Sequence, residues 1–362
     1  MSITKKPFGV TPYGYPATLY TITNSTGAGV DVCDFGGILA AIRVPDKNGV
    51  LGDVLLGYPS VEGYTPLNGY IGALIGRVGN RIADGKCDLE GTPLTLAKNE
   101  KGITHLHGGN VGFDRKMWSV QPVEGICEDS LILRYVSLDG EEGYPGTLKV
   151  QVTYTFTDLN ELFIHYEAVS DKDTLCSLTN HSYFNLEGEA SGSTVDHIFE
   201  INADTMTAVD ENAIPTGEVR DVTGTLFDLR DPKSLREIYE KMADEPMLAM
   251  ASGFDHNFNV NDTDAGLRFA VGVTAPVSGR VMNVYTDMPA VQFYDGTMLK
   301  GINPSKSGRM YAQYDGFCLE TQYAPDSVNH PNFPDTILRA GEKYDYTTIF
   351  SFDTVGDDED EE

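Results

Sequence analysis

The chain has 362 residues, of which 41% are hydrophobic and 10% aromatic, so it can bury a large core and wholesale disorder is disfavoured. It carries 54 Asp and Glu against 26 Lys and Arg, a formal net charge of -28, and leaving out the six acidic residues at 357–362 still gives -22. Because such a surface repels phosphate backbones and anionic lipid, roles on nucleic acid or on a membrane surface are disfavoured, and a neutral or cationic ligand is favoured.

Alternation of apolar and polar residues is the dominant local pattern, and it predicts β-strands. In chain order, strands are expected at 130–136, 151–157, 162–169, 197–201, 267–273, 281–285, 290–294 and 344–352. Within 151–157, Val152, Tyr154 and Phe156 fall on one side of the strand. The short polar stretch at 158–160 then predicts a hairpin with the next strand.

One segment, 231–242, has a helical pattern, with Pro232 near its first turn and Leu235, Ile238 and Tyr239 on one face. Because the strands follow one another without intervening helices, we expect an all-β antiparallel sandwich and not a parallel α/β sheet. The chain shows neither an internal repeat nor a central linker. Residues 1–356 are therefore expected to form one domain, followed by an acidic solvated tail at 357–362.

The N-terminus and the cysteines predict a cytoplasmic protein. No apolar segment follows Lys5 and Lys6, so no secretory signal is expected, and no stretch approaches the roughly 20 apolar residues of a membrane span. The five cysteines lie far apart without CxxC or Cys-His spacing, which predicts free thiols in a reducing compartment: Cys33, Cys87, Cys127, Cys176 and Cys318. A monomer and a homodimer both remain open.

Several common motifs are absent from the sequence. It contains no phosphate-binding GxxxxGK[ST] loop, no GxGxxG fingerprint and no GxSxG nucleophile elbow. His105 and His107 could point the same way from a strand and so bind a metal, but the residues that follow, 108–113, supply no carboxylate. We therefore expect no metal.

Polar side chains instead recur among aromatic residues and glycines, a mixture that suits a sugar. A pyranose offers hydroxyls to Arg, Asn, Asp and Gln side chains and an apolar C–H face to aromatic rings. The stretches concerned are 76–82, 105–115, 180–186, 253–256, 291–293 and 316–322.

These stretches resemble the aldose 1-epimerase (galactose mutarotase) family over nearly the whole chain, from about residue 9 to residue 352. The matching motifs are GRVxNRI, LHGG with GFDxxxW, NHSYFNL, GFDH, and GFCLETQ with PDxVN. The resemblance implies a β-supersandwich of two large antiparallel sheets with few short helices. It also implies interconversion of the α and β anomers of free aldohexoses such as galactose or glucose, with no cofactor.

The same resemblance implies roles for individual residues. The glutamate of LETQ, Glu320, would be the catalytic base, and the histidine of NHSYFNL, His181, the catalytic acid. Substrate-binding positions would be Asn80, Arg81, His107, Tyr183, Asp255 and Gln292. One departure from the family pattern, Tyr323 directly after LETQ, could alter sugar preference at the rim of the site.

The chemistry leaves some of these roles open. An acid at His181 has to be protonated near neutral pH, and we expect a nearby carboxylate, Asp255 or Glu320, to favour that charge. His107 could share the acid role or hold a sugar hydroxyl, and holding is favoured. Arg81 is expected to clamp a hydroxyl or the ring oxygen rather than to form a structural ion pair.

Three other functions compete with an epimerase of free sugars. A hexose-6-phosphate 1-epimerase would need a basic pocket, which Arg77, Arg81 and Arg115 could offer. A non-catalytic carbohydrate-binding protein would have no reason to keep both an acid and a base. A glycoside hydrolase would need two carboxylates at one bond, and Glu320 with Asp255 is the available pair.

Overall fold

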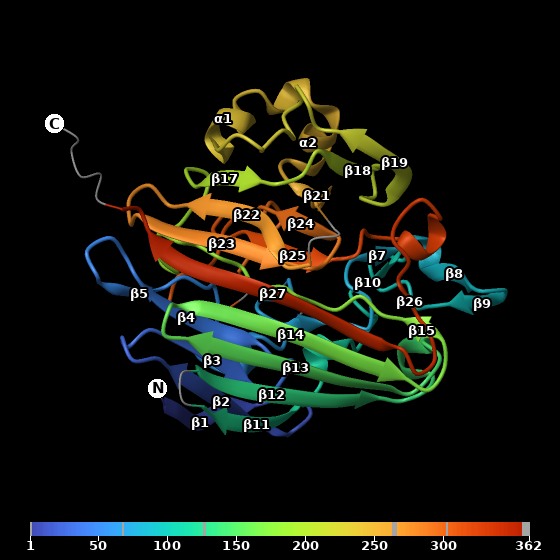
Figure 1. The fold of residues 1–362 in the computed structure, drawn as a ribbon, viewed down its shortest axis with the longest axis horizontal. Helices are drawn as coiled ribbons and strands as arrows, with labels where there is room; N and C mark the ends of the chain where they lie inside the picture. The colour runs from blue at the N-terminus through green and yellow to red at the C-terminus, as the bar shows by residue number, and fades with distance from the viewer. Residues whose placement is uncertain (1, 67–68, 126–127, 263–265, 302, 357–362) are drawn as a thin grey trace.

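The computed structural model describes all residues except 1, 67–68, 126–127, 263–265, 302 and 357–362. The expected acidic tail therefore lies outside the described residues. Every pairing between the named strands is antiparallel, as the alternating patterns predicted (Figure 1).

The largest sheet has nine strands and contains most of the predicted ones. Its hairpin of β13 and β14 is the predicted one, with Phe156 opposite Leu162. In sheet order the strands are β11 (Ser119–Glu124), β12 (Glu128–Ser137), β13 (Leu148–Thr157), β14 (Glu161–Ser170), β27 (Lys343–Thr354), β23 (Arg280–Thr286), β22 (Arg268–Thr274), β17 (Ile198–Ile201) and β20 (Lys233–Ser234).

Two five-stranded sheets pack against this one. The first runs in the order β1 (Ser2–Val10), β2 (Pro16–Thr23), β3 (Gly29–Cys33), β4 (Leu39–Pro45), β5 (Leu51–Asp53). The second runs β19 (Pro215–Asp221), β18 (Thr205–Val209), β21 (Asp255–Asn259), β24 (Ala290–Tyr294), β25 (Cys318–Gln322). Phe184 forms isolated bridges to Leu55 and Phe317, just beyond β5 and just before β25, and so links the two five-stranded sheets.

The predicted sandwich is thus confirmed, with one of its layers divided in two. Ile42 on β4, Leu133 on β12 and Val291 on β24 belong to one continuous buried cluster, so all three sheets share a core. Four short pairs complete the strands: β7 (Arg81–Ile82) with β10 (His105–Leu106), β6 (Leu74–Ile75) with β16 (Thr179–Asn180), β15 (Thr174–Leu175) with β26 (Ile337–Leu338), and β8 (Lys86–Leu89) with β9 (Thr92–Thr95).

The helix expected at 231–242 is shorter than predicted. The helix α1 spans only Leu235–Tyr239, because the preceding residues form β20 and pair with β17. The side chain of Ser234 accepts a hydrogen bond from the backbone N–H of Glu237 and so caps the helix. Pro232 lies outside the helix, and a second helix, α2 (Pro246–Ala251), was not predicted. In the described part of the chain, neither helix has the length and apolar character of a membrane span.

Candidate active site

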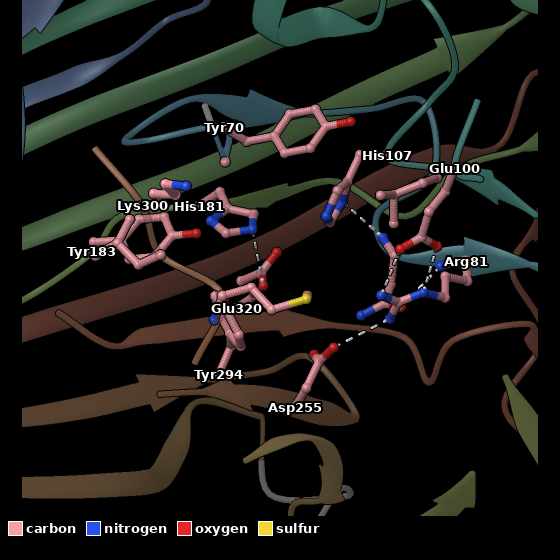
Figure 2. Close-up of a pocket in the computed structure, with 15 residues that line it drawn as sticks. Tyr70, Arg81, Glu100, His107, His181, Tyr183, Asp255, Tyr294, Lys300 and Glu320 are labelled. Atoms are coloured by element: carbon pink, nitrogen blue, oxygen red, sulfur yellow. Dashed lines mark hydrogen bonds and ion pairs between the residues drawn. The ribbon is translucent and has the colours of Figure 1, made fainter. Parts of the chain in front are cut away.

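A cavity of about 320 Å³ collects most of the predicted site residues (Figure 2). Seven of the eight line it, and the eighth, Gln292, does not. The lining residues are Gly69, Tyr70, Asn80, Arg81, Glu100, Leu106, His107, His181, Tyr183, Asp255, Tyr294, Met298, Leu299, Lys300 and Glu320.

Strand alternation directs Glu320 into this cavity. On β25, Leu319 packs into the core, whereas Cys318 and Glu320 fall on the opposite face. In the neighbouring strand, Gln292 lies directly opposite Glu320. Within the described residues, Oε2 of Glu320 is buried and has no hydrogen-bond partner, so this oxygen is available to a ligand.

Glu320 and His181 are in contact within the cavity. Oε1 of Glu320 lies 3.7 Å from Nε2 of His181, and Figure 2 shows the two groups next to each other. The two groups therefore lie side by side. This arrangement suits two groups that have to reach two oxygens bonded to the same carbon.

Burial shifts the pKa values of these two groups in opposite directions. It raises the pKa of Glu320 well above its usual value, with a further contribution from the charge of Asp255 and opposition from Arg81. It lowers the pKa of His181 to about 4, which Asp255 counteracts only in part. Asp255 thus favours the charged form of His181 as expected, but the cost of burying the imidazolium is larger.

The ring of His181 is held by aromatic neighbours and by a thiol. It stacks on Tyr183 and Tyr70, with ring centroids 5.1 and 5.9 Å away and an interplanar angle of 29° in both cases. Its backbone N–H donates to the carbonyl of Ala73 at 2.9 Å. Its Nδ1 lies 3.4 Å from Sγ of Cys318, so Nε2 is the nitrogen that faces Glu320.

His107 reaches the cavity from the turn after β10. The backbone N–H of Asn80 donates to its Nδ1 at 3.1 Å, so the neutral ring carries its proton on Nε2. Burial and the neighbouring His181 lower the pKa of His107 well below its usual value. The next residue has to be glycine, because a Cβ at Gly108 would lie 1.8 Å from the carbonyl oxygen of Gly76.

Arg81 is bound mainly by carboxylates. Its Nε and Nη2 donate to the two oxygens of Glu100 at 2.8 and 3.0 Å, and Nη1 lies 3.4 Å from Oδ2 of Asp255. Burial alone would lower the pKa of Arg81, but the two carboxylates outweigh burial and raise it. Arg81 therefore lines the cavity and also belongs to an ion-pair network, although the two roles were expected to exclude each other.

The remaining predicted residues occupy different positions relative to the cavity. Asn80 and Tyr183 line it directly. Gln292 lies behind the wall and donates from Nε2 to Oδ1 of Asp255 at 2.7 Å. Tyr323, where the sequence departs from the family pattern, hydrogen-bonds to the hydroxyl of Tyr346 and is not among the lining residues.

Sequence reasoning missed several residues of the cavity. Tyr70 contacts both histidines, with its ring 4.6 Å from that of His107. Glu100 pairs with Arg81, and no motif surrounds either Tyr70 or Glu100. The other missed lining residues are Gly69, Tyr294, Met298, Leu299 and Lys300, with Leu106 known only as part of its motif.

Three possible metal ligands meet in the site, although the sequence predicted no metal. One ligand atom each from His107, His181 and Glu320 lie within 4.8 Å of one another. A metal on Nε2 of His107 would require the proton on Nδ1, where it would face the N–H of Asn80. The donor set therefore fits a metal poorly. His105 points elsewhere, hydrogen-bonding to the carbonyl of Ala97 and the hydroxyl of Tyr144.

The three arginines considered for a phosphate pocket do not converge. Arg77 is 2% exposed, is not among the cavity-lining residues, and donates to the carbonyls of residues 137, 138, 145 and 146. Arg115 lies next to Asp114 in a neighbouring hollow. Only Arg81 lines the cavity, and two carboxylates already contact it.

Comparison with known proteins identifies the same family that the sequence motifs resemble. The family model for aldose 1-epimerase matches residues 18–351. The chain is 44% identical over 351 residues to galactose mutarotase of Homo sapiens, covering 97% of this chain and 98% of that protein. It is 37% identical over 343 residues to aldose 1-epimerase of Escherichia coli K12, covering 94% and 96%.

Solved structures show the same fold. An aldose epimerase homologue from C. elegans superposes with a TM-score of 0.83 at 29% identity, covering 93% of this chain and 99% of that one. Galactose 1-epimerase from Lactobacillus acidophilus superposes with a TM-score of 0.84 at 26% identity, covering 98% and 99%.

Proposed function

The chain belongs to the aldose 1-epimerase family, and we propose that Glu320 and His181 are the general base and general acid with which it interconverts the α and β anomers of free aldoses. The observation that carries this assignment is the 3.7 Å contact between the two groups in a sugar-sized cavity. A carboxylate and an imidazole at such a distance can each exchange a proton with a different oxygen of one anomeric centre.

The proposed reaction balances with these two residues alone. The Glu320 carboxylate takes the proton from O1 while the His181 imidazolium gives a proton to O5. The C1–O5 bond then breaks and leaves an aldehyde at C1. After rotation about C1–C2, the neutral imidazole takes the proton back from O5, the protonated carboxyl returns one to O1, and the ring closes on the other face.

Burial favours the protonation state that follows ring opening. The raised pKa of Glu320 and the lowered pKa of His181 both favour a neutral pair, with the proton on the carboxyl. That pair is the state reached once O1 has lost its proton and O5 has gained one. Burial of the site thus stabilises the neutral Glu320–His181 pair, which accompanies the open-chain sugar, relative to the charged pair that accompanies the closed ring at the start of the reaction.

His107 holds a sugar oxygen in this proposal and does not share the acid role. Protonating its Nδ1 would place two N–H groups against each other at Asn80, so its Nε2–H is a fixed donor. We propose direct sugar contacts for Asn80, Arg81, Tyr183 and Asp255 as well, and we propose that Gln292 orients Asp255.

The cavity favours a neutral aldohexose, with galactose and glucose as the proposed substrates. Two cations line it, Arg81 and Lys300, but Arg81 is already paired with the carboxylates of Glu100 and Asp255, so the cavity offers little positive charge to a hexose phosphate. A protein that only binds carbohydrate would gain nothing from a buried acid–base pair, whose burial is costly.

The cellular location and assembly are also part of the proposal. Four of the five cysteines are described, and all four are buried free thiols, as expected in a reducing compartment. We therefore propose a cytoplasmic protein that acts as a monomer or homodimer. Cell fractionation with light scattering on the purified protein would check both.

Polarimetry tests the activity directly. Freshly dissolved α-galactose and α-glucose should approach their ordinary final rotation faster with the protein than without it. An altered final rotation would indicate different chemistry. Galactose 6-phosphate and glucose 6-phosphate serve as the comparison, and faster mutarotation of these than of the free sugars would favour the phosphate branch instead.

Substitution of the proposed acid and base tests the assignment. Glu320→Gln and His181→Asn should each lower kcat by about 10²- to 10⁴-fold, because each removes one proton-transfer group. Circular dichroism should show an unchanged fold. The surface substitutions Glu124→Gln and His165→Asn are the matched controls, and near-normal activity of either site variant would remove that residue from the mechanism.

A further inference from the structure

We propose that Cys318 is a positioning residue whose sulfur accepts a hydrogen bond from Nδ1–H of His181, so that Nε2 is the nitrogen that exchanges its proton. The inference rests on the proposed function, because it specifies how the acid works. Sγ of Cys318 lies 3.4 Å from Nδ1, and both side chains are buried, the cysteine completely.

A single strand positions both partners of the imidazole. Cys318 and Glu320 are two residues apart on β25, and so they point to the same face. The sulfur contacts Nδ1 at 3.4 Å, and the carboxylate faces Nε2 at 3.7 Å. The two nitrogens of one ring are therefore assigned to two side chains whose spacing is fixed by the strand.

Proton counting determines which way the hydrogen bond runs. If the thiol donated to Nδ1, the neutral ring of His181 would carry its only proton on Nε2. Transfer of that proton to O5 would then leave an imidazolate, which is far too basic to form here. With the proton held on Nδ1, the imidazolium gives its Nε2 proton to O5 and becomes an ordinary neutral imidazole.

The main-chain carbonyl of His181 is the other acceptor close to its ring. This oxygen already accepts the backbone N–H of Gly72 at 2.8 Å. It favours a protonated ring but gives no assignment of the proton to one nitrogen, so the assignment to Nδ1 rests on the sulfur.

His107 shows the opposite arrangement, which separates the roles of the two histidines. A backbone donor faces its Nδ1, so its proton is fixed on Nε2. The cavity thus contains one imidazole that only donates, His107, and one whose Nε2 is free to gain and lose a proton, His181.

A thiol also differs from the carboxylate that orients many catalytic histidines. A carboxylate at Nδ1 stabilises the imidazolium, whereas the sulfur of Cys318 is a weak, uncharged acceptor. The ring is oriented without gaining a strong preference for the charged form. Once protonated, His181 is for this reason a strong proton donor to the ring oxygen.

Nitrogen NMR of the full-length protein labelled with ¹⁵N-histidine tests the tautomer without any substrate. At neutral pH, His181, assigned through loss of its signals in His181→Asn, should show protonated Nδ1 and unprotonated Nε2. His107 should show the reverse pattern. A His181 signal with the proton on Nε2 would overturn the proposal even if the enzyme is active.

Three substitutions test the consequence for catalysis. Cys318→Ala should lower kcat about 10-fold and leave KM within about 2-fold, because substrate contacts are kept and only the orientation of the acid is lost. Cys318→Ser, whose hydroxyl also accepts, should keep kcat within about 3-fold and keep the Nδ1–H signal. Cys176→Ala, at an equally buried free thiol outside the cavity, should match the wild type.

The outcomes distinguish this inference from the proposed function. Unchanged kcat in Cys318→Ala would overturn the role of Cys318 while leaving Glu320 and His181 as base and acid. Absence of mutarotation in the wild type would instead overturn the function, whatever the tautomer. If Cys318→Ala fails to fold, the tautomer of the wild type still decides the matter.

Discussion

Glu320 and His181 share one proton over a wide range of pH, because burial acts on a carboxylate and on an imidazole in opposite senses. The pKa of His181 is about 4 and that of Glu320 is raised well above 4.5. Between those two values the pair holds a single proton, which lies on either partner. The titration therefore belongs to the pair, and activity should follow the fraction of molecules with that one proton.

This protonation pattern predicts the pH dependence of kcat/KM. Below about pH 4 a second proton enters the pair and no base remains, so activity falls. Above the raised pKa of Glu320 the last proton leaves and no acid remains, so activity falls again. Initial rates by polarimetry should show a plateau that begins above about pH 4 and ends at the raised pKa of Glu320. An upper limb at pH 4.5, the ordinary pKa of a glutamate, would contradict the shared proton.

Removal of the neighbouring charge should move the upper limb of that profile. The negative charge of Asp255 raises the pKa of Glu320, so Asp255→Asn should let the last proton leave at a lower pH. The same substitution removes the ion pair between Asp255 and Arg81, and the freed Arg81 charge also lowers the pKa of Glu320. Measured on the same substrate, the upper limb should shift to lower pH, and an unchanged limb or a shift to higher pH would show that Asp255 is not a source of the raised pKa.

At the scale of elements, alternation predicted the long strands of the nine-stranded sheet, but it missed the short strands and also the first five-stranded sheet, whose β1 and β2 have nine and eight residues. The hairpin of β13 and β14 and the strand β24 follow from side chains that alternate between core and solvent or lie in a run of β-formers. Two-residue strands such as β7 and β10 are too short for any period to show. They form because the chain is brought together by tertiary contacts, which a local pattern does not encode.

The helix α1 also shows that a local pattern does not determine where an element begins. Its apolar face, with Leu235 and Ile238, was identified correctly. The start of the helix was predicted too early, because Lys233 and Ser234 gain ladder hydrogen bonds with β17 that compete with a further helical turn.

The site residues divide in a similar way. Residues within motifs were predicted, whereas Tyr70 and Glu100 enter the cavity from loops without a motif.

Arg77 is predicted to stabilise the connection between β12 and β13. Its buried guanidinium donates to four carbonyls in and around that connection, and to the hydroxyls of Ser137 and Thr174. Arg77→Met should lower the free energy of unfolding by at least about 3 kcal/mol, because buried carbonyls lose their partners. Urea unfolding measures this loss.

The matched control for that substitution is Arg134→Met, at an exposed position on β12, which should change stability by less than about 0.5 kcal/mol. Because Arg77 does not line the cavity, the folded Arg77→Met protein should retain its kcat/KM for free aldoses. Selective loss of activity on hexose phosphates with unchanged stability would instead make Arg77 a phosphate ligand.

At the scale of the whole molecule, the cavity draws its residues from one five-stranded sheet and from short strands and loops outside it. Asp255, Tyr294 and Glu320 come from neighbouring strands of one five-stranded sheet, whereas His181 follows a short strand outside it. The geometry of the acid–base pair therefore depends on how the layers pack. We propose that residues 1–356 behave as one domain, since a separate motion of one sheet would break the pair.

Cooperative unfolding tests this proposal. Trp118 is the only tryptophan, is 3% exposed, and belongs to the same buried cluster as Met206 and Phe258 in the distant five-stranded sheet. Because the cluster is continuous, its two ends should lose their packing together. Tryptophan fluorescence, which reports the region beside β11, and far-UV circular dichroism, which reports all strands, should give the same urea midpoint. Trp118→Phe controls for the origin of the fluorescence change. Two separated midpoints would show that the sheet region around Trp118 unfolds by itself, and the chain would then have to be divided into two domains that meet at the active site.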